Sequence, residues 1–496
     1  TNGHTTETTA ALYGRSGKLD YLLNGTISEN DHVEIGGGEI LENSASENTA
    51  LLARGGFQIG DNQRFDISFR HNNREEGVPS NPNANVGSSS PLVERDITDQ
   101  NMTANYWVQG FDGKHTSKFT VYRNDTQFDE FRPTQGDSSL GILGQHDNTE
   151  VTTTGIALTN ATQGIGAEWV YGLDWYQDEV STVRDGDNRP DDMDADTDVL
   201  GLYVQADFTF ANVLTLTPGV RYDRFEAESH NLDGSARDDS AVSPSFAASV
   251  KAAEWMSLTA SYAKAFRAPG IEEMYTEGTH FCYGDFSFMG LGYLCNTFVP
   301  NPDLDAEEAK NTELRADFAF NGLATENDQL TASASLFRNK VDNFIEQLTV
   351  NPHFMFGFPM NTTYQNVDEA ELKGFELGAN YQANDLSLGL SYGQTEGKDL
   401  SNDSYLSNIP ADKWVLDLGY YFLQRDLKTG LRTSVVSAQD QLPEEEDRVF
   451  KSYTLADAYV TWEPATGTLN GVKLGLALDN LTDETYRVAF QELYMP

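Results

Sequence analysis

The sequence predicts an all-β protein that forms a transmembrane antiparallel β-barrel. Two observations support this prediction: apolar residues alternate with polar ones along many stretches, and the connections between these stretches are alternately short and long. Counted in this way, the chain holds about 20 strands. Many of them exceed the roughly 9 to 11 residues that a strand needs to cross a bilayer.

The alternation is clearest in the segment 386–393, LSLGLSYG, where every second residue is leucine or tyrosine and the residues between are serine or glycine. A repeat of two residues indicates a strand, because successive side chains of a strand point to opposite faces. The pattern recurs at 199–210, 413–422 and 472–480. A water-soluble β-sandwich alternates too, so the pattern alone leaves sandwich and barrel open.

The connections favour the barrel. Short connections alternate with longer polar loops, such as 74–97 and 185–198, along the whole chain. Strict alternation places every long loop on one side, as in outer-membrane barrels with short periplasmic turns and long extracellular loops. The short connections are expected near Ser16-Gly17, Gly60-Asp61-Asn62, Asp112-Gly113, Gly164, Ala211-Asn212, Ala253-Glu254, Asn321-Gly322, Asn384-Asp385, Thr429-Gly430 and Thr466-Gly467.

The composition argues against nucleic-acid binding, and the absence of catalytic motifs argues against an enzyme. With 33 Lys and Arg against 77 Asp and Glu, the formal net charge is −44, so phosphate backbones repel the chain. No apolar run reaches 18 residues and the mean hydropathy is −0.49, values that barrel strands share with soluble proteins. The sequence also has no GxSxG, HExxH, GxxxxGKS, GxxxxGKT or GxGxxG motif.

One stretch, 266–304, carries the strongest indication of a ligand. It begins with FRAP, Phe266 to Pro269, and ends with NPDL, Asn301 to Leu304. Between them lies one histidine, His280. The same stretch is rich in aromatic side chains, which suit a flat, apolar ligand: Tyr275, Phe281, Tyr283, Phe286, Phe288, Tyr293 and Phe298.

These motifs resemble the FRAP and NPNL segments of haem receptors in the TonB-dependent outer-membrane family, with Asp303 where that family usually has Asn. The segments AEEAKNTELRADF at 306–318 and EAELKGFELGANYQA at 369–383 resemble strands of the same family. The end of the chain, NLTDETYR at 480–487, resembles the family's NLFDKxYR. The resemblance spans residues 261–490, and before about Phe210 only the architecture supports it.

The short first connection and the resemblance together complete the strand count: the connection implies a strand before Thr1, and the resemblance implies one after Pro496. Residues 1–496 are expected to form one barrel domain that lacks a first strand before Thr1 and a last strand after Pro496. One strand at each end gives 22, the size of outer-membrane transporters whose lumen is plugged. The family's N-terminal plug domain, with the segment that contacts TonB, is not included in this sequence.

The resemblance also implies a binding site. The extracellular loop 270–305 is expected to bind haem, with His280 as an axial ligand of the haem iron. Arg267 is expected either to meet a haem propionate or to form an ion pair in the barrel wall, the latter being favoured. Tyr275 and His353 are further candidate haem contacts, His353 within the apolar segment NPHFMFGFPM.

The two cysteines, Cys282 and Cys295, both lie in the expected binding loop. Their spacing is too wide for a CxxC metal or redox motif. In an oxidising compartment we expect them to form one local disulfide, which would order the loop before it captures a ligand.

The function implied by the resemblance is TonB-dependent haem uptake at the outer membrane of a Gram-negative bacterium. The expected partners are haem, haemoglobin or a haemophore as its source, TonB through the plug, and outer-membrane lipid. Three alternatives stay open: a TonB-dependent receptor for a siderophore or cobalamin, a passive porin, and a secreted adhesive β-protein.

Overall fold

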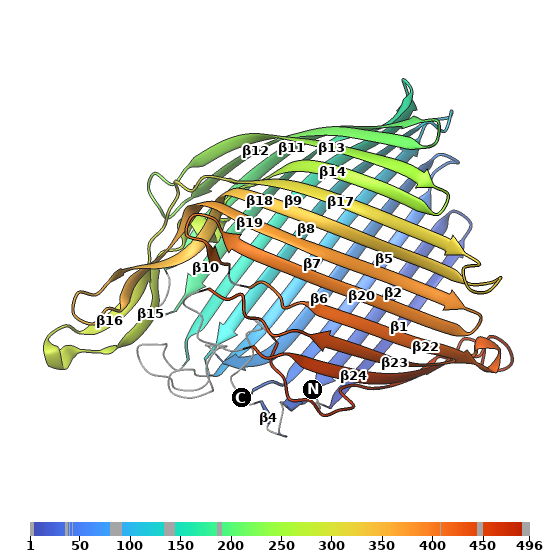
Figure 1. The fold of residues 1–496 in the computed structure, drawn as a ribbon. Helices are drawn as coiled ribbons and strands as arrows, with labels where there is room; N and C mark the ends of the chain where they lie inside the picture. Colours follow the sequence, from blue (N-terminus) through green and yellow to red (C-terminus); the bar gives the residue numbers. More distant parts are fainter. Residues whose placement is uncertain are drawn as a thin grey trace.

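The computed structural model describes residues 4–34, 38, 40–41, 43–79, 92–132, 144–185, 191–406, 408–443 and 450–488. Long, tilted strands lie side by side and wrap into a barrel, as Figure 1 shows. The first half of the wall consists of β1 (Thr5–Ser16), β2 (Leu19–Asn30), β5 (Ser46–Gln58), β6 (Gln63–Pro79), β7 (Leu92–Gln109), β8 (His115–Phe131), β9 (His146–Gly164), β10 (Ala167–Arg184), β11 (Met193–Phe210) and β12 (Leu214–Ser229).

The second half of the wall continues in chain order and closes most of the circle. It consists of β13 (Arg237–Ala253), β14 (Met256–Arg267), β17 (Glu307–Asn321), β18 (Gln329–Pro352), β19 (Pro359–Ala383), β20 (Leu386–Asp399), β22 (Lys413–Phe422), β23 (Leu427–Val436), β24 (Tyr453–Trp462) and β25 (Leu474–Leu478). These 20 strands, with three short strands of the connections, form one 23-stranded sheet of the described residues. The predicted all-β antiparallel barrel of about 20 strands is confirmed.

The short strands belong to the loops. They are β15 (Gly278–Asp285), β16 (Tyr293–Phe298) and β21 (Ser404–Tyr405) in the main sheet, with β3 (Val33–Glu34) and β4 (Ile40–Leu41) as a separate pair. Along the wall each strand pairs with the next in antiparallel register, and within the described ranges β1 pairs only with β2 and β25 only with β24. The described residues contain no helix that is long and apolar enough to cross a membrane.

The short connections lie where the sequence predicts them, with one exception. The turn expected at Thr429-Gly430 is wrong, because both residues are inside β23 and the turn is the 3-10 helix η2 (Leu423–Arg425). Gln424 has a φ of 58° there. No glycine, proline or asparagine marks this turn, so the nearby Thr-Gly pair was the stronger sequence signal.

The predicted long loops are shorter than expected, because the strands continue into the polar segments that were assigned to the loops. Residues 74–79 and 92–97 of the expected loop 74–97 belong to β6 and β7, and residues 193–198 of the expected loop 185–198 belong to β11. Polar residues pair in a ladder as well as apolar ones do, because the ladder is made by the backbone.

The strands present an apolar face and an ionic face. On β6, Ile67 is 55% exposed, whereas the alternate residue Asp66 is 5% exposed and accepts hydrogen bonds from Arg64 and Arg54. Such alternation is what a barrel needs to place apolar side chains against lipid and polar ones in its interior.

Candidate ligand-binding site

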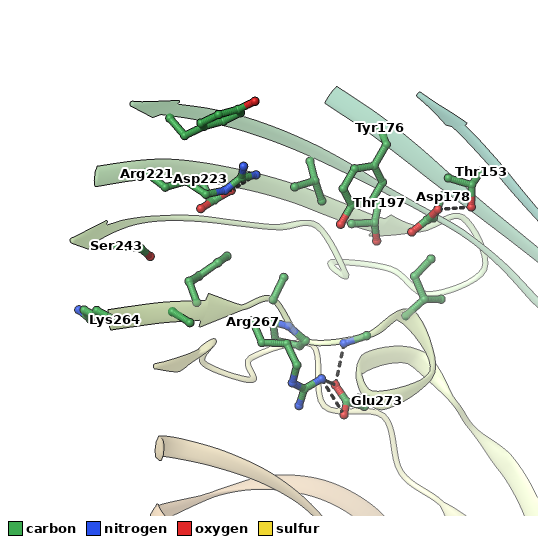
Figure 2. Close-up of a pocket in the computed structure, with 18 of the residues that line it drawn as sticks. Thr153, Tyr176, Asp178, Thr197, Arg221, Asp223, Ser243, Lys264, Arg267 and Glu273 are labelled. Atoms are coloured by element: carbon green, nitrogen blue, oxygen red, sulfur yellow. Dashed lines mark hydrogen bonds and ion pairs between the residues drawn. The ribbon is translucent and has the colours of Figure 1, made fainter. Parts of the chain in front are cut away.

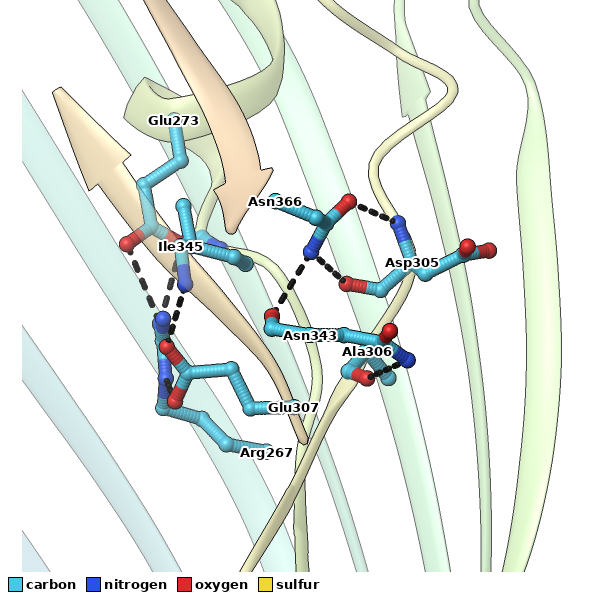
Figure 3. Close-up of polar contacts among 9 residues, drawn as sticks. Arg267, Glu273, Asp305, Ala306, Glu307, Asn343, Ile345 and Asn366 are labelled. Atoms are coloured by element: carbon cyan, nitrogen blue, oxygen red, sulfur yellow. Dashed lines mark hydrogen bonds and ion pairs between the residues drawn. The ribbon is translucent and has the colours of Figure 1, made fainter. Parts of the chain in front are cut away.

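The segment from FRAP to NPDL leaves the barrel at Arg267 in β14 and returns at Glu307 in β17, which lie opposite each other in the ladder. Arg267 Nε donates to Glu307 Oε2 at 2.6 Å, and its Nη1 donates to Glu273 Oε2 at 2.9 Å, as Figure 3 shows. Glu307 Oε1 in turn accepts the backbone N–H of Ile345 at 2.8 Å. Arg267 therefore forms the ion pairs that were favoured for it.

The NPDL end of the loop is tied to the hairpin of β18 and β19. Asn301 Nδ2 donates to the carbonyl of Tyr364 at 2.9 Å. Asn366 of β19 connects the loop end to β18, as Figure 3 shows. Its Oδ1 accepts a hydrogen bond from the Asp305 N–H, and its Nδ2 donates to the carbonyls of Asp305 and Asn343, each at 2.8 Å. Both motifs thus fix the base of the loop.

Tyr275 does not line a ligand surface, contrary to the sequence-based expectation. It ends the short helix α1 (Ile271–Tyr275), is 3% exposed, and donates its hydroxyl to the carbonyl of Ser235 at 3.0 Å. Burial raises its pKa to about 12. Met274 and Leu304 are fully buried beside it in the same apolar cluster, so α1 is packed against the wall and Tyr275 is a core residue.

The middle of the loop is a hairpin of β15 and β16 that projects away from the barrel in Figure 1. The expected disulfide is present: Cys282 and Cys295 are directly opposed and bonded. The register shifts by one residue on each side of Cys282, which leaves His280 and Tyr283 as the extra residues of two β-bulges. A bulge re-aims a side chain, and such features are frequent next to functional sites.

Because of the bulges, His280 and Tyr283 both contact β19, although residues three apart on a regular strand point to opposite faces. His280 Nδ1 lies 3.1 Å from Thr362 Oγ1, and the Tyr283 hydroxyl donates to the carbonyl of Pro359 at 2.6 Å. The two hairpins are also joined through the backbone, since β16 pairs in parallel with β19 at Thr297 and Phe298. The loop and its neighbour thus form one unit.

His280 is half-buried within this unit, whereas an exposed loop histidine was expected. Its ring lies 4.2 Å, centroid to centroid, from the ring of Phe298. Burial lowers the pKa of His280, against a smaller raising effect of the hydrogen bond with Asn296. The neutral imidazole, which is the form that binds metals, is therefore favoured near neutral pH.

His353 lies apart from His280, in the turn between β18 and β19. Its ring stacks on Phe354 and Phe356, with centroid separations of 4.8 and 5.2 Å. Phe286 of the first hairpin contacts Phe356 at 5.0 Å, so the two tips share one aromatic cluster. Several large apolar side chains of these tips are exposed: Phe288, Met289, Leu291, Phe354 and Met355.

A cavity of about 1060 Å³ lies beneath the FRAP segment, between α1 and β9 to β14. Figure 2 shows Tyr176 and Arg221 on its wall and Arg267 and Glu273 on the loop side. Arg221 is held by Asp174 and Asp223. The cavity is slightly larger than the usual small-molecule site, and its lining mixes apolar with polar groups.

The sequence-predicted residues therefore divide into separate places. His280, Cys282 and Cys295 lie together in the projecting hairpin, His353 lies at the neighbouring tip, and Arg267 lies at the loop base. Thr362 and Asn296, which surround His280, were missed because neither stands in a motif, and Thr362 is 82 residues away in sequence. Within the described residues, no group of three His, Cys, Asp or Glu side chains is placed to hold a metal ion.

The comparisons with known proteins agree with this fold. A family model described as TonB dependent receptor-like, beta-barrel matches residues 39–481. The chain is 30% identical to the Heme/hemopexin utilization protein C of Haemophilus influenzae, covering 93% of this chain and 70% of that protein. It is 28% identical to the Hemin receptor of Yersinia enterocolitica, covering 83% and 59%. The chain belongs to the TonB-dependent receptor β-barrel family.

Solved structures share the architecture. The FrpB iron transporter from Neisseria meningitidis superposes with a TM-score of 0.76 at 19% identity, covering 98% of this chain and 76% of that one. The Serratia marcescens hemophore receptor HasR, solved with its hemophore HasA and heme, gives 0.75 at 20% identity, covering 98% and 78%. At these identities the likeness concerns the fold alone.

Proposed function

We propose that this chain is the barrel of an outer-membrane receptor that takes up haem, with His280 as the ligand of the haem iron. The observation that carries the proposal is the position of His280. It is the extra residue of a β-bulge in a disulfide-bonded hairpin, and it lies between the FRAP and NPDL motifs. Its Nδ1 is hydrogen-bonded to Thr362. A metal-ligating histidine usually has its second nitrogen held in this way.

The surroundings of His280 suit a porphyrin. The aromatic cluster of the two hairpin tips offers apolar surface for a flat macrocycle. The cavity below the FRAP segment has Tyr176 and Tyr203 on its wall, whose rings can contact a porphyrin that moves inward. The names of the relatives in Haemophilus and Yersinia point to the same ligand.

The partners follow from membership of the family. TonB would supply energy from the inner membrane through a plug domain, and lipid would surround the apolar faces of the strands. A haem-carrying protein, as hemopexin is in one relative's name and the hemophore in one solved complex, would be the source of the haem. We propose transport rather than enzymatic chemistry as the activity.

The test compares the binding of three ligands. The full-length protein in detergent is titrated with ferric haem, with a ferric catecholate siderophore and with cyanocobalamin, and binding is followed by absorption and calorimetry. Only haem should bind, with a shift of its Soret band. Tight binding of the siderophore or cobalamin with no response to haem would overturn the proposal.

A further inference from the structure

The side chains behind His280 are linked by hydrogen bonds that lead to a backbone carbonyl, and Asn296 also bonds His280 directly. His280 Nδ1 lies 3.1 Å from Thr362 Oγ1, Thr362 Oγ1 lies 2.6 Å from Asn296 Oδ1, and Asn296 Nδ2 lies 3.0 Å from the oxygen of Pro359. Thr362 and Asn296 are both 0% exposed. Buried polar groups need their partners, so each link of the chain has a defined direction.

The direction follows from the carbonyl end. A carbonyl oxygen only accepts, so the Asn296 amide must turn its NH₂ group toward Pro359. The amide oxygen then faces Thr362 and also only accepts, so the Thr362 hydroxyl must donate its single proton to it. With its proton donated to Asn296, Thr362 Oγ1 can only accept a hydrogen bond from His280. Nδ1 of His280 therefore carries the proton.

We propose that Thr362 and Asn296 are positioning residues that hold His280 in the tautomer with its proton on Nδ1, which leaves Nε2 as the nitrogen able to coordinate the iron of a ferric porphyrin. A neutral imidazole has one protonated and one unprotonated nitrogen, and only the unprotonated one can bind a metal. The identity of the ligand rests on the proposed function, whereas the tautomer does not.

His353 provides the contrast within the same unit. Its Nδ1 accepts the backbone N–H of Met355 at 3.3 Å, so in the neutral ring the proton is on Nε2. That tautomer does not offer Nε2 to a metal. Two histidines on neighbouring hairpins are thus held in opposite tautomers, and of the two His280 is the one with an unprotonated Nε2.

The first arm of the test measures the tautomer without any ligand. The full-length protein is labelled with ¹⁵N-histidine, and the His280 signals are those lost in His280→Ala. The wild type should show a protonated Nδ1 and an unprotonated Nε2. Thr362→Val, which removes the hydroxyl at nearly constant volume, should lose this preference, whereas Thr362→Ser should keep it. A protonated Nε2 in the wild type, or an unchanged tautomer in Thr362→Val, overturns the inference.

The second arm adds ferric haem to the same variants. Thr362→Val should bind haem about tenfold or more weakly, the usual loss when the partner of a metal-ligating histidine is removed, and Thr362→Ser should bind as the wild type does. In the ferrous complex of Thr362→Val the iron–imidazole stretching band should move to lower frequency. If the tautomer is as expected but haem does not bind, the proposed function fails and the inference about the tautomer stands.

Discussion

Arg267 and Glu307 face each other across the last rung between β14 and β17, with Nε and Oε2 2.6 Å apart. This ion pair closes the base of the binding loop, and Glu273 adds a second carboxylate from inside the loop. The FRAP motif therefore acts on the loop's geometry. Its arginine is committed to two glutamates.

Replacing either partner of this pair should loosen the loop. Arg267→Ala and Glu307→Gln should each cost on the order of 1 kcal/mol, because the guanidinium is partly exposed, and should weaken haem binding severalfold with an unchanged spectrum. Calorimetry and haem titration measure both effects. Arg123→Ala, which breaks the exposed pair with Asp125, is the control. If Arg267→Ala weakens binding while Glu307→Gln does not, Arg267 contacts a propionate instead.

The disulfide should order the hairpin and leave the barrel alone. The bonded cysteines are 13 residues apart in sequence, and closing a loop of this size stabilises it by about 3 kcal/mol in the chain-entropy model. The double variant Cys282→Ser, Cys295→Ser should be cut faster by protease within β15 and β16 and should bind haem more weakly. The Tm of the barrel is expected to be unchanged. Equal protease resistance of both proteins would contradict this role.

The pH dependence of haem binding should reflect the burial of His280. Since burial lowers the pKa of this imidazole from its ordinary 6.5, the neutral, ligating form persists to lower pH than in an exposed histidine. Binding should therefore be lost on acidification with a midpoint below 6.5, measured by haem titration between about pH 5 and 8. His353→Ala should give the same curve. A midpoint at or above 6.5 in the wild type would show that burial does not act in this way.

The turn between β17 and β18 contains a buried carboxylate whose charge is part of the fold. Asp328 is 2% exposed and accepts the backbone N–H groups of Leu323, Ala324 and Thr325 at 2.6 to 2.7 Å. Burial alone would raise the pKa of Asp328, but these bonds and the hydroxyl of Tyr381 lower it to about 2. Because the pKa of Asp328 is lower in the folded state than in the unfolded state, its charge stabilises the fold at pH values above the unfolded pKa of 3.8. This stabilisation is lost as the pH falls toward about 2.

Asp328→Asn should therefore lower the Tm at pH 7, and the difference from the wild type should shrink as the pH approaches 2. Circular dichroism melts at both pH values measure this. Glu326→Gln, an exposed carboxylate of the same turn, is the matched control and should have no effect. A constant difference between Asp328→Asn and the wild type over the whole range would contradict the role of the charge.

The fold was predictable because apolar and polar side chains alternate along the strands of a barrel, and because turn-forming residues mark most of the short connections at one end of the barrel. The turn at Leu423–Arg425 escaped because its conformation depends on residues with no turn preference. The ends of the strands were not predicted, because polar side chains at 74–79 or 193–198 do not show where backbone pairing stops.

The site was predictable only as far as motifs reach. His280 is bracketed by two of them, and the cysteines lie close together in sequence. The bulges, the contact with Thr362 and the burial of Tyr275 depend on how two hairpins distant in sequence pack together, and no local pattern encodes that. Arg267 shows the limit most clearly, since the motif marks the residue but only the structure shows its partners.

His280→Ala is the direct test of whether His280 ligates the haem iron. The variant and the wild type, both full-length and in detergent, are titrated with ferric haem while the Soret band is recorded, with His353→Ala as the control. We expect His280→Ala to change the spectrum of bound haem and to weaken binding strongly, with an unchanged Tm, while His353→Ala behaves as the wild type. Unchanged affinity and spectrum in His280→Ala would show that His280 is not a ligand of the haem iron.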